Sequence, residues 1–196
     1  MEPDRFVDRV FKRVPDGPVS DFFFEHWSHE GKPTEEGIGI LAVPGADPER
    51  VLACVFDVDH YAENIPHVDE CRAIADPSYD PPTVRFYQRI RIPLIGKVHH
   101  ELVLERLGSL RGYEVACWHM LARETEALSS RAAIRSHYSD GVWIAAAGVV
   151  GYGLSSAPRR EDTGFLKWKA LTVGADAAAP RVIRDNIEGM AGWAAR

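Results

Sequence analysis

The sequence predicts an α+β fold in which a curved antiparallel β-sheet wraps around a long C-terminal α-helix, with two short helices after the first strands. Three observations predict it: a capped helical segment at residues 47–66, strand-like segments joined by short turns over about 68–173, and a last amphipathic helix over about 177–195. Consecutive strands joined by tight turns form an antiparallel sheet rather than a parallel one. A sheet closed by a helix in this way surrounds an apolar hollow.

The length and composition fit one globular domain. The chain has 196 residues, of which 45% are hydrophobic and 27% charged, so a single domain over residues 1–196 with a substantial core is expected. The net charge of -6 argues against a nucleic-acid partner, because such a partner requires a basic surface. The three cysteines are far apart and show no metal-type spacing, which is typical of reduced thiols.

No targeting signal is recognised in the sequence, which predicts a cytoplasmic protein. Residues 1–20 carry charges throughout and lack the apolar stretch of a signal peptide. The longest apolar run, Val142 to Leu154, is shorter than the ~20 residues of a membrane span. We therefore expect a cytoplasmic protein with no stable membrane insertion, whereas transient contact with a membrane surface stays open.

The first 43 residues predict a helix and two strands. Phe6, Val7, Val10, Phe11 and Val14 recur at helical spacing, so a short amphipathic helix is expected over 4–14. Aromatic residues fill the segment 20–30, and glycines alternate with apolar residues over 37–43. These two segments are predicted strands, joined by a polar turn over 31–36.

The segment 47–66 predicts two short helices. Asp47 is a favourable N-cap and Pro48 stands at the first helical position, where proline is well tolerated. Asp57 and Asp59 favour caps over helix interiors, so a break is expected there. Pro66 ends the segment.

The rest of the chain predicts a meander of strands and a last helix. Strands are expected over about 68–75, 83–92, 97–107, 112–121, 131–139, 142–157 and 163–173, with hairpin turns at 93–96 and 108–111. The last helix is predicted to start at 177–180 and to present Val182, Ile183, Ile187 and Met190 on its apolar face. Gly189 and Gly192 weaken its end by about 1 kcal/mol each relative to alanine, which suggests that this end moves to admit a ligand.

Several short motifs occur in a familiar order. They are Ala46–Asp47–Pro48–Glu49 with Val51, Asp57 with Asp59 and Tyr61, Ile65–Pro66 with Val68, Tyr87–Gln88–Arg89–Ile90 leading into Pro93, and Asp140–Gly141–Val142–Trp143. Together with the last helix, this pattern resembles the START / Bet v 1-like superfamily, also called the SRPBCC or polyketide cyclase and lipid-transport superfamily. The resemblance spans about residues 37–195 and implies the helix-grip fold. Residues 1–36 are then an N-terminal extension with a short helix and an edge strand.

The resemblance also implies a function. Members mostly bind or carry lipids, sterols, quinones or polyketide-like molecules in an internal cavity, and a few are cyclases, dehydratases or hydrolases. The lipid-transfer subgroup often has an Arg–Asp pair after its central hairpin, where this chain has Gly96–Lys97. A particular lipid therefore does not follow from the resemblance.

Turn positions give a strand register and hence candidate cavity residues. If 108–111 closes one hairpin, His100 faces His119 and Leu102 faces Cys117. If 93–96 closes the preceding one, Arg89 faces His100 and Tyr87 faces Leu102, with Gln88, Glu101 and Trp118 on the opposite face. A bulge or a change of one residue in either turn would reverse the faces, and the apolar residues on the side of Gln88 conflict with the assignment, so which face lines the cavity stays open.

The candidate cavity residues come from these strands, the later strands and the last helix. The predicted ligand-binding set is Tyr87, Arg89, His100, Leu102, Cys117, His119, Tyr138, Trp143, Tyr152, Trp168, Ile183, Ile187 and Met190. Arg135 and Lys167 are candidates for holding a charged head group. No cofactor is implied. No metal site is predicted either, since His100 and His119 have no evident third ligand.

Two functions are favoured by the sequence, and a partner-binding or assembly role through an exposed sheet edge also stays open. The first is a binding or transport protein for an apolar or amphipathic small molecule. The second is a cyclase or dehydratase in which His100, His119 or Arg89 acts as acid or base on a polyketide-like or aromatic substrate. No nucleophile motif occurs, so binding is favoured over catalysis. The ligand and the oligomeric state are not determined.

Overall fold

The structure is a computed structural model that describes residues 5–92, 96–121, 128 and 133–196, apart from the side chains of Ile92 and Lys167. The helices are α1 (Phe6–Phe11), α2 (Pro48–Phe56), α3 (Tyr61–Asn64) and α4 (Phe165–Ala194), with 3-10 turns η1 (Val58–His60) and η3 (Arg160–Asp162). The strands are β1 (Phe22–Trp27), β2 (Glu36–Ala42), β3 (Val68–Ala73), β4 (Val84–Ile92), β5 (Gly96–Leu110), β6 (Tyr113–Met120), β7 (Ile134–Ala146) and β8 (Val149–Pro158).

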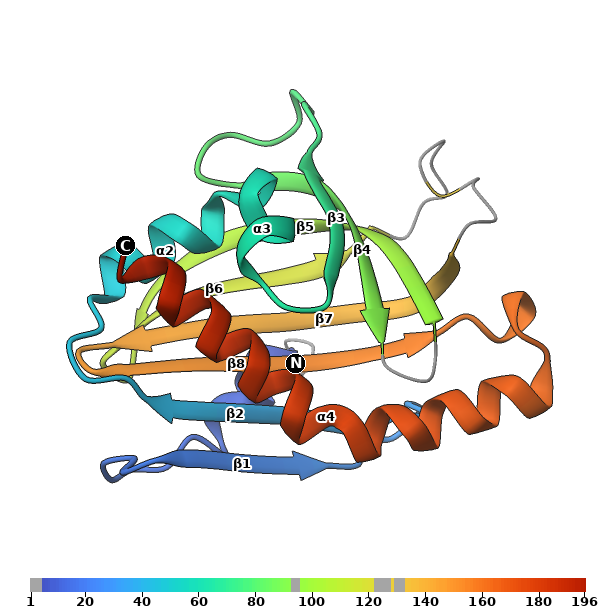
Figure 1. Ribbon diagram of the computed structural model, residues 1–196, viewed down its shortest axis with the longest axis horizontal. Helices are drawn as coiled ribbons and strands as arrows, with labels where there is room; N and C mark the ends of the chain where they lie inside the picture. The colour runs from blue at the N-terminus through green and yellow to red at the C-terminus, as the bar shows by residue number, and fades with distance from the viewer. Residues whose placement is uncertain (1–4, 93–95, 122–127, 129–132) are drawn as a thin grey trace.

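The strands form one curved sheet in the order β1-β2-β8-β7-β6-β5-β4-β3. Neighbours in this order pair antiparallel, and β5 also makes a short parallel contact with β7. Helix α4 lies across the concave face, with α2 and α3 at one end (Figure 1). The predicted α+β helix-grip fold is confirmed.

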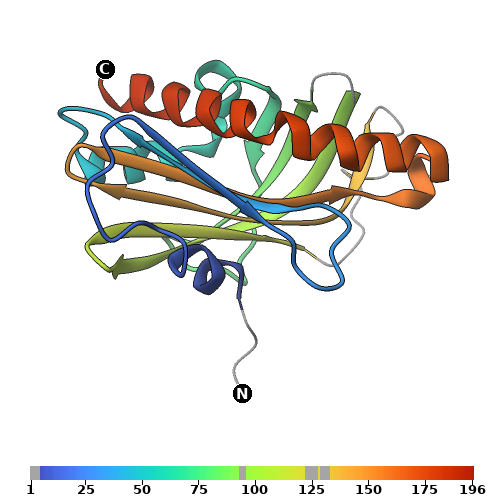
Figure 2. The ribbon, with the colours of Figure 1, turned by 90° about the horizontal axis from the view of Figure 1, so that it is seen from below.

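Two apolar cores cover the two faces of the sheet. On the concave face, Ile183, Ile187 and Met190 of α4 pack against a cluster that includes Trp143 and Tyr152. On the convex face, α1 packs its apolar residues against another cluster that includes Ile38 and Ile144. Figure 2 shows α4 and α1 on opposite sides of the sheet. Among the described residues before β2, α1 thus covers part of the convex face and β1 is the edge strand.

The segment 47–66 folds as predicted. Asp47 caps α2 by accepting a hydrogen bond from the backbone N–H of Glu49, and Pro48 is its first residue. The helix ends at Phe56, and η1 and α3 follow after Asp57. Within the described part of the chain, no helix combines the length and apolar character needed to cross a membrane.

The strand predicted over 163–173 is wrong, because this segment is the first part of α4. Pro180 lies inside the helix rather than at its start. Leu171 and Ala175 pack against Val98 and Ile90, so contact with the sheet holds this part of the helix in place. Tertiary burial compensates for the hydrogen bond that an internal proline removes.

The strand boundaries predicted between 131 and 157 and the turn predicted at 108–111 are also wrong. The chain runs straight through Asp140–Gly141 as one strand, β7, and turns at Ala147–Gly148. The β5–β6 hairpin turns at Arg111–Gly112, both with positive φ as a two-residue type I′ turn requires. Gly108, also with positive φ, lies beside a bulge in β5 instead. Most of the turn predicted at 93–96 lies outside the described residues.

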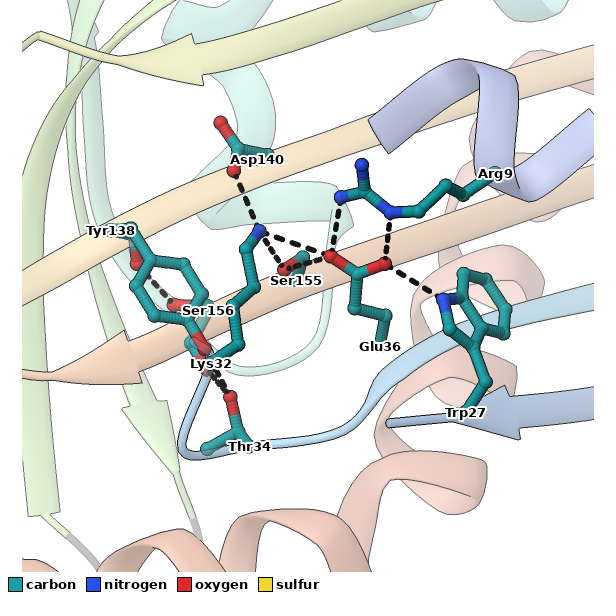
Figure 3. A network of polar contacts seen from close by, with 9 residues as sticks. All are labelled: Arg9, Trp27, Lys32, Thr34, Glu36, Tyr138, Asp140, Ser155 and Ser156. Atoms are coloured by element: carbon teal, nitrogen blue, oxygen red, sulfur yellow. Dashed lines mark hydrogen bonds and ion pairs between the residues drawn. The ribbon is translucent and has the colours of Figure 1, made fainter. Parts of the chain in front are cut away.

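A buried ion cluster fastens α1 to the convex face (Figure 3). The Arg9 guanidinium donates to both carboxylate oxygens of Glu36, at 2.7 and 2.6 Å, and Glu36 is fully buried. Trp27 Nε1 donates to the same carboxylate at 2.8 Å, and Lys32 Nζ lies 3.0 Å from it. Burial raises the pKa of Glu36, but the hydrogen bonds from Arg9, Lys32 and Trp27 outweigh burial and lower it to about 2.

Gly189 has a packing role that its place near a helix end does not suggest. A Cβ atom there would lie 2.5 Å from Pro66 Cδ and 2.7 Å from the Asn64 carbonyl oxygen. The missing side chain therefore lets the α3–β3 connection approach α4 closely. A Cβ atom at Gly192 would meet nothing within 4 Å.

Replacement of these two glycines by alanine should change the stability of the protein in opposite directions. Gly192→Ala is expected to stabilise the protein by up to about 1 kcal/mol, because alanine is the better helix former. Gly189→Ala is expected to destabilise it by about 1–2 kcal/mol, because the steric cost exceeds that gain. Urea unfolding of both variants measures this difference. Equal stabilisation by both substitutions would contradict the close packing at Gly189.

Candidate ligand-binding cavity

A cavity of about 60 Å³ lies between α4 and the concave face of the sheet. We call it the inner cavity. Most of its wall is apolar and includes Phe86, Leu102, Leu104, Trp118 and Trp143. The polar side chains in its lining include Tyr61, His67, Gln88, Arg91, His100, Ser139, Tyr152, Ser156 and Asn186. An apolar wall with a few polar groups is typical of small-molecule sites.

A second cavity of about 90 Å³, the adjoining cavity, lies further along α4. Ile90, Leu154, Ser156 and Val182 line both cavities, so these four side chains form the partition between them. Each cavity is smaller than the ~300–1,000 Å³ of pockets that hold drug-sized ligands. Even together the two cavities fall short of that range, so a ligand of that size requires the partition and other parts of the wall to move.

His100 is the most deeply buried titratable group in the inner wall. Its Nδ1 lies 2.9 Å from Ser136 Oγ, and its Nε2 lies 3.0 Å from Gln88 Oε1. Burial, assisted by neighbouring His99, lowers the pKa of His100 to about 3. The ring is therefore neutral at pH 7, and both nitrogens already have partners. A weak, fully engaged base of this kind is poorly suited to general acid–base catalysis.

Charged groups near the inner cavity are paired at its rim. His67 Nε2 lies 3.1 Å from Asp185 Oδ2 on α4, which links the α3–β3 connection to that helix. The Arg91 guanidinium donates to Asp69 at 2.7 Å, and the Arg91 side chain is 65% exposed. Neither contact places an unpaired charge inside the cavity.

The adjoining cavity has an acidic lining. Glu35, Glu36 and Asp176 contribute to it, and the backbone N–H of Glu35 donates to Asp176 Oδ1. Burial, with repulsion from Glu35, raises the pKa of Asp176. Among the described side chains of this lining, His26 is the only basic one, and it already contacts Glu35.

The predicted register is wrong for both central hairpins. Gln88, rather than Arg89, pairs with His100, a shift of one residue. Val103, rather than His100, pairs with His119, a shift of three. Both shifts are an odd number of residues. Because successive side chains of a strand point to opposite faces, each shift reverses which side chains of the neighbouring strand share a face with His100. His100 and His119 consequently lie on opposite faces and cannot form the predicted row with Arg89.

Several predicted cavity residues lie elsewhere for this reason. Tyr87, Arg89, Cys117 and His119 point to the convex side, where Arg89 pairs with Asp69 and Glu70. Tyr138 also points there and contacts Thr34 Oγ1 at 2.7 Å (Figure 3). Trp118, predicted to face away, lines the inner cavity instead.

The remaining predicted residues fall into three groups. His100, Leu102, Trp143 and Tyr152 line the inner cavity, and Ile183 lines the adjoining one. Ile187 and Met190 pack in the concave core without lining either cavity. The last group lies near the start of α4: Trp168 donates to the Pro158 carbonyl, Arg135 pairs with Asp162, and the Lys167 side chain is outside the described part.

The sequence reasoning missed Asn186, Gln88, Ser139 and Ser156 as cavity residues. One signal pointed to Asn186. It stands three residues after Ile183 and four before Met190, which places an amide within the apolar stripe of the last helix. A polar residue at such a position requires a partner or a function.

Comparison with solved structures finds the same fold in two classes of protein. A STAR-related lipid transfer protein from Xanthomonas axonopodis matches with a TM-score of 0.68 and 10% identity, over 92% of this chain and 97% of that one. Human STARD10 matches with a TM-score of 0.66 and 12% identity, over 95% and 79%. The ZhuI aromatase/cyclase from Streptomyces sp. R1128 matches with a TM-score of 0.55 and 15% identity, over 89% and 95%.

These likenesses establish the fold, which is that of START / Bet v 1-like proteins. No family model and no curated protein sequence matches the chain.

Proposed function

We propose that this protein binds or carries an apolar or amphipathic small molecule in the hollow between α4 and the sheet. The observation that carries the proposal is the inner cavity, whose wall is mainly apolar and whose partition with the adjoining cavity consists of four side chains. Burial of an apolar ligand there gains about 25 cal/mol per Å² of surface removed from water.

The fold comparisons support the proposal in general terms. One of the similar structures is named as a STAR-related lipid transfer protein and another as an aromatase/cyclase. These two names concern lipids and aromatic compounds. The comparisons do not select one ligand for this chain.

The enzymatic alternative is less well supported. It relied on His100, His119 and Arg89 meeting inside the cavity, whereas only His100 contributes to the wall. His100 has a pKa of about 3 and partners at both ring nitrogens. A cyclase reaction in this cavity would therefore need a different acid or base.

Fluorescence titration with N-phenyl-1-naphthylamine tests the binding function. Saturable one-to-one binding is expected, together with competition by other apolar molecules and enhanced fluorescence from the dry environment. Native mass spectrometry of the gently desalted protein should detect any co-purified small molecule. The proposal fails if neither the probe nor a panel of fatty alcohols, sterols and aromatic compounds binds saturably.

A further inference from the structure

Asn186 carries a buried acceptor without a partner. The residue is 8% exposed and lines the inner cavity, and no group in the described structure donates to its Oδ1 atom. Within the described residues only one other buried side-chain atom, His99 Nε2, shares this condition. His99 lies on the convex side of β5, away from the cavity. Asn186 is therefore the orphaned acceptor that belongs to the cavity.

The Asn186 side chain is also held in place. It hydrogen-bonds to the hydroxyl of Tyr152, a residue that burial keeps protonated by raising its pKa. With the amide N–H used in this way, the carbonyl oxygen is the remaining polar atom. An unmade hydrogen bond at a buried polar group costs about 1–3 kcal/mol, so a fold does not keep one without compensation.

The surroundings of Asn186 favour an uncharged partner. The wall of the inner cavity is mainly apolar, and the basic side chains at its rim, Arg91 and His67, contact Asp69 and Asp185. The adjoining cavity carries Glu35 and Asp176. Among the described side chains of the two linings, none offers a phosphate or carboxylate a buried cation that is not already in contact with an acidic group, and burial of an unpaired charge is costly.

We infer that Asn186 Oδ1 is the polar anchor for a neutral ligand that presents a hydroxyl or N–H donor on an apolar skeleton. This inference rests on the proposed binding function and narrows its ligand class. It makes Asn186 a specificity-determining residue: the apolar wall supplies affinity, and the amide selects molecules with a donor at one position. Analogues without the donor leave Oδ1 unpaired and lose affinity.

The test compares three aromatic probes of similar size: 1-naphthol, 1-methoxynaphthalene and 1-naphthoate. Each is titrated in competition with N-phenyl-1-naphthylamine at pH 7, where 1-naphthol is neutral. The protein is expected to bind 1-naphthol about 5- to 100-fold more tightly than the methyl ether, and 1-naphthoate most weakly. In Asn186→Leu the preference for 1-naphthol over its methyl ether should disappear while the ether still binds.

A stability measurement separates recognition from a structural role. Asn186→Leu also removes the hydrogen bond to the Tyr152 hydroxyl, so its stability is measured in a Tyr152→Phe background. There the leucine replaces an orphaned polar group by an apolar side chain of similar size, so the ligand-free double variant should unfold at the same or a higher temperature than Tyr152→Phe alone. A clear fall relative to Tyr152→Phe would identify Asn186 as a structural residue and overturn the inference. Thr172→Val is the matched control, because it removes a buried hydroxyl of α4 that lines neither cavity. It should keep the preference for 1-naphthol.

The remaining outcomes are also decisive. If the unmodified protein binds 1-naphthol and its methyl ether equally, or if Asn186→Leu retains the preference, Asn186 is not the anchor, although the binding function stands. If none of the probes binds, N-phenyl-1-naphthylamine included, the proposed function itself fails.

Discussion

Glu36→Gln is expected to lower the melting temperature by roughly 10 °C or more, which is the largest stability effect we predict for a single substitution. The fully buried carboxylate neutralises Arg9 and Lys32 and accepts from Trp27. A neutral amide removes the negative charge that Arg9 and Lys32 share in this buried cluster, and the contact of Lys32 with Asp140 at 3.2 Å replaces only part of it, so a cost of about 3–5 kcal/mol is expected. Thermal unfolding followed by circular dichroism measures the change.

The matched control is Glu25→Gln. The Glu25 carboxylate of β1 lies 3.5 Å from Arg13, two residues after the end of α1, so this pair also links the α1 region to the sheet, but Glu25 is 44% exposed. Exposed pairs contribute about 0–1 kcal/mol, so a small shift is expected. Similar effects of the two substitutions would show that the buried cluster does not hold α1.

The lowered pKa of Glu36 predicts that the stability of the protein depends on pH. The pKa of Glu36 is about 2 in the folded protein, against 4.5 for an ordinary glutamate. Because the folded value is lowered, the stabilisation is fully present above pH ~4.5 and disappears as the pH falls towards 2, a change of about 3 kcal/mol. The unfolding free energy of Glu36→Gln should lack this part of the decline. Parallel pH profiles for the two proteins would contradict the assignment.

Val182→Phe is expected to weaken binding of N-phenyl-1-naphthylamine by at least about 100-fold, a loss of about 2.7 kcal/mol. Val182 lines both cavities from α4, and the added ring carbons would occupy space comparable to the inner cavity of about 60 Å³. Since the phenyl group fills a hollow rather than a packed core, the fold should tolerate it better than ordinary overpacking.

The control for this prediction is Val173→Phe on the same helix. Val173 is 63% exposed and lines neither cavity, so its replacement should leave the affinity unchanged. Circular dichroism establishes that both variants are folded before the titration. If Val182→Phe binds the probe as tightly as the unmodified protein does, the ligand does not occupy these cavities.

Local chemistry determined much of the fold. Asp47 and Pro48 begin the helix, and Asp57 and Asp59 favour its end. Both effects were predictable, because capping depends on backbone groups close by in the chain. Strand periodicity likewise depends on adjacent residues. The segment 47–66, most strands and the antiparallel order were therefore predictable from the sequence.

The assignment of residues to the cavity was only partly predictable. It depended on register, and register depends on whether a glycine forms a turn or a bulge. Gly108 and Gly112 both have positive φ, yet the hairpin turns at Gly112. A register error of three residues in the β5–β6 hairpin placed the predicted His119 side chain on the wrong face of the sheet. A register error of one residue in the β4–β5 hairpin did the same for Arg89.

The sequence by itself determined that a curved antiparallel sheet encloses a C-terminal helix, because periodicity and capping are local properties. Only the tertiary structure decided that 163–173 belongs to that helix, since Leu171 is held there by Val98 of a distant strand. It also decided which side of each strand faces the hollow. Asn186 was visible in the sequence as an amide in an apolar stripe, but its orphaned oxygen depends on neighbours brought together from other strands.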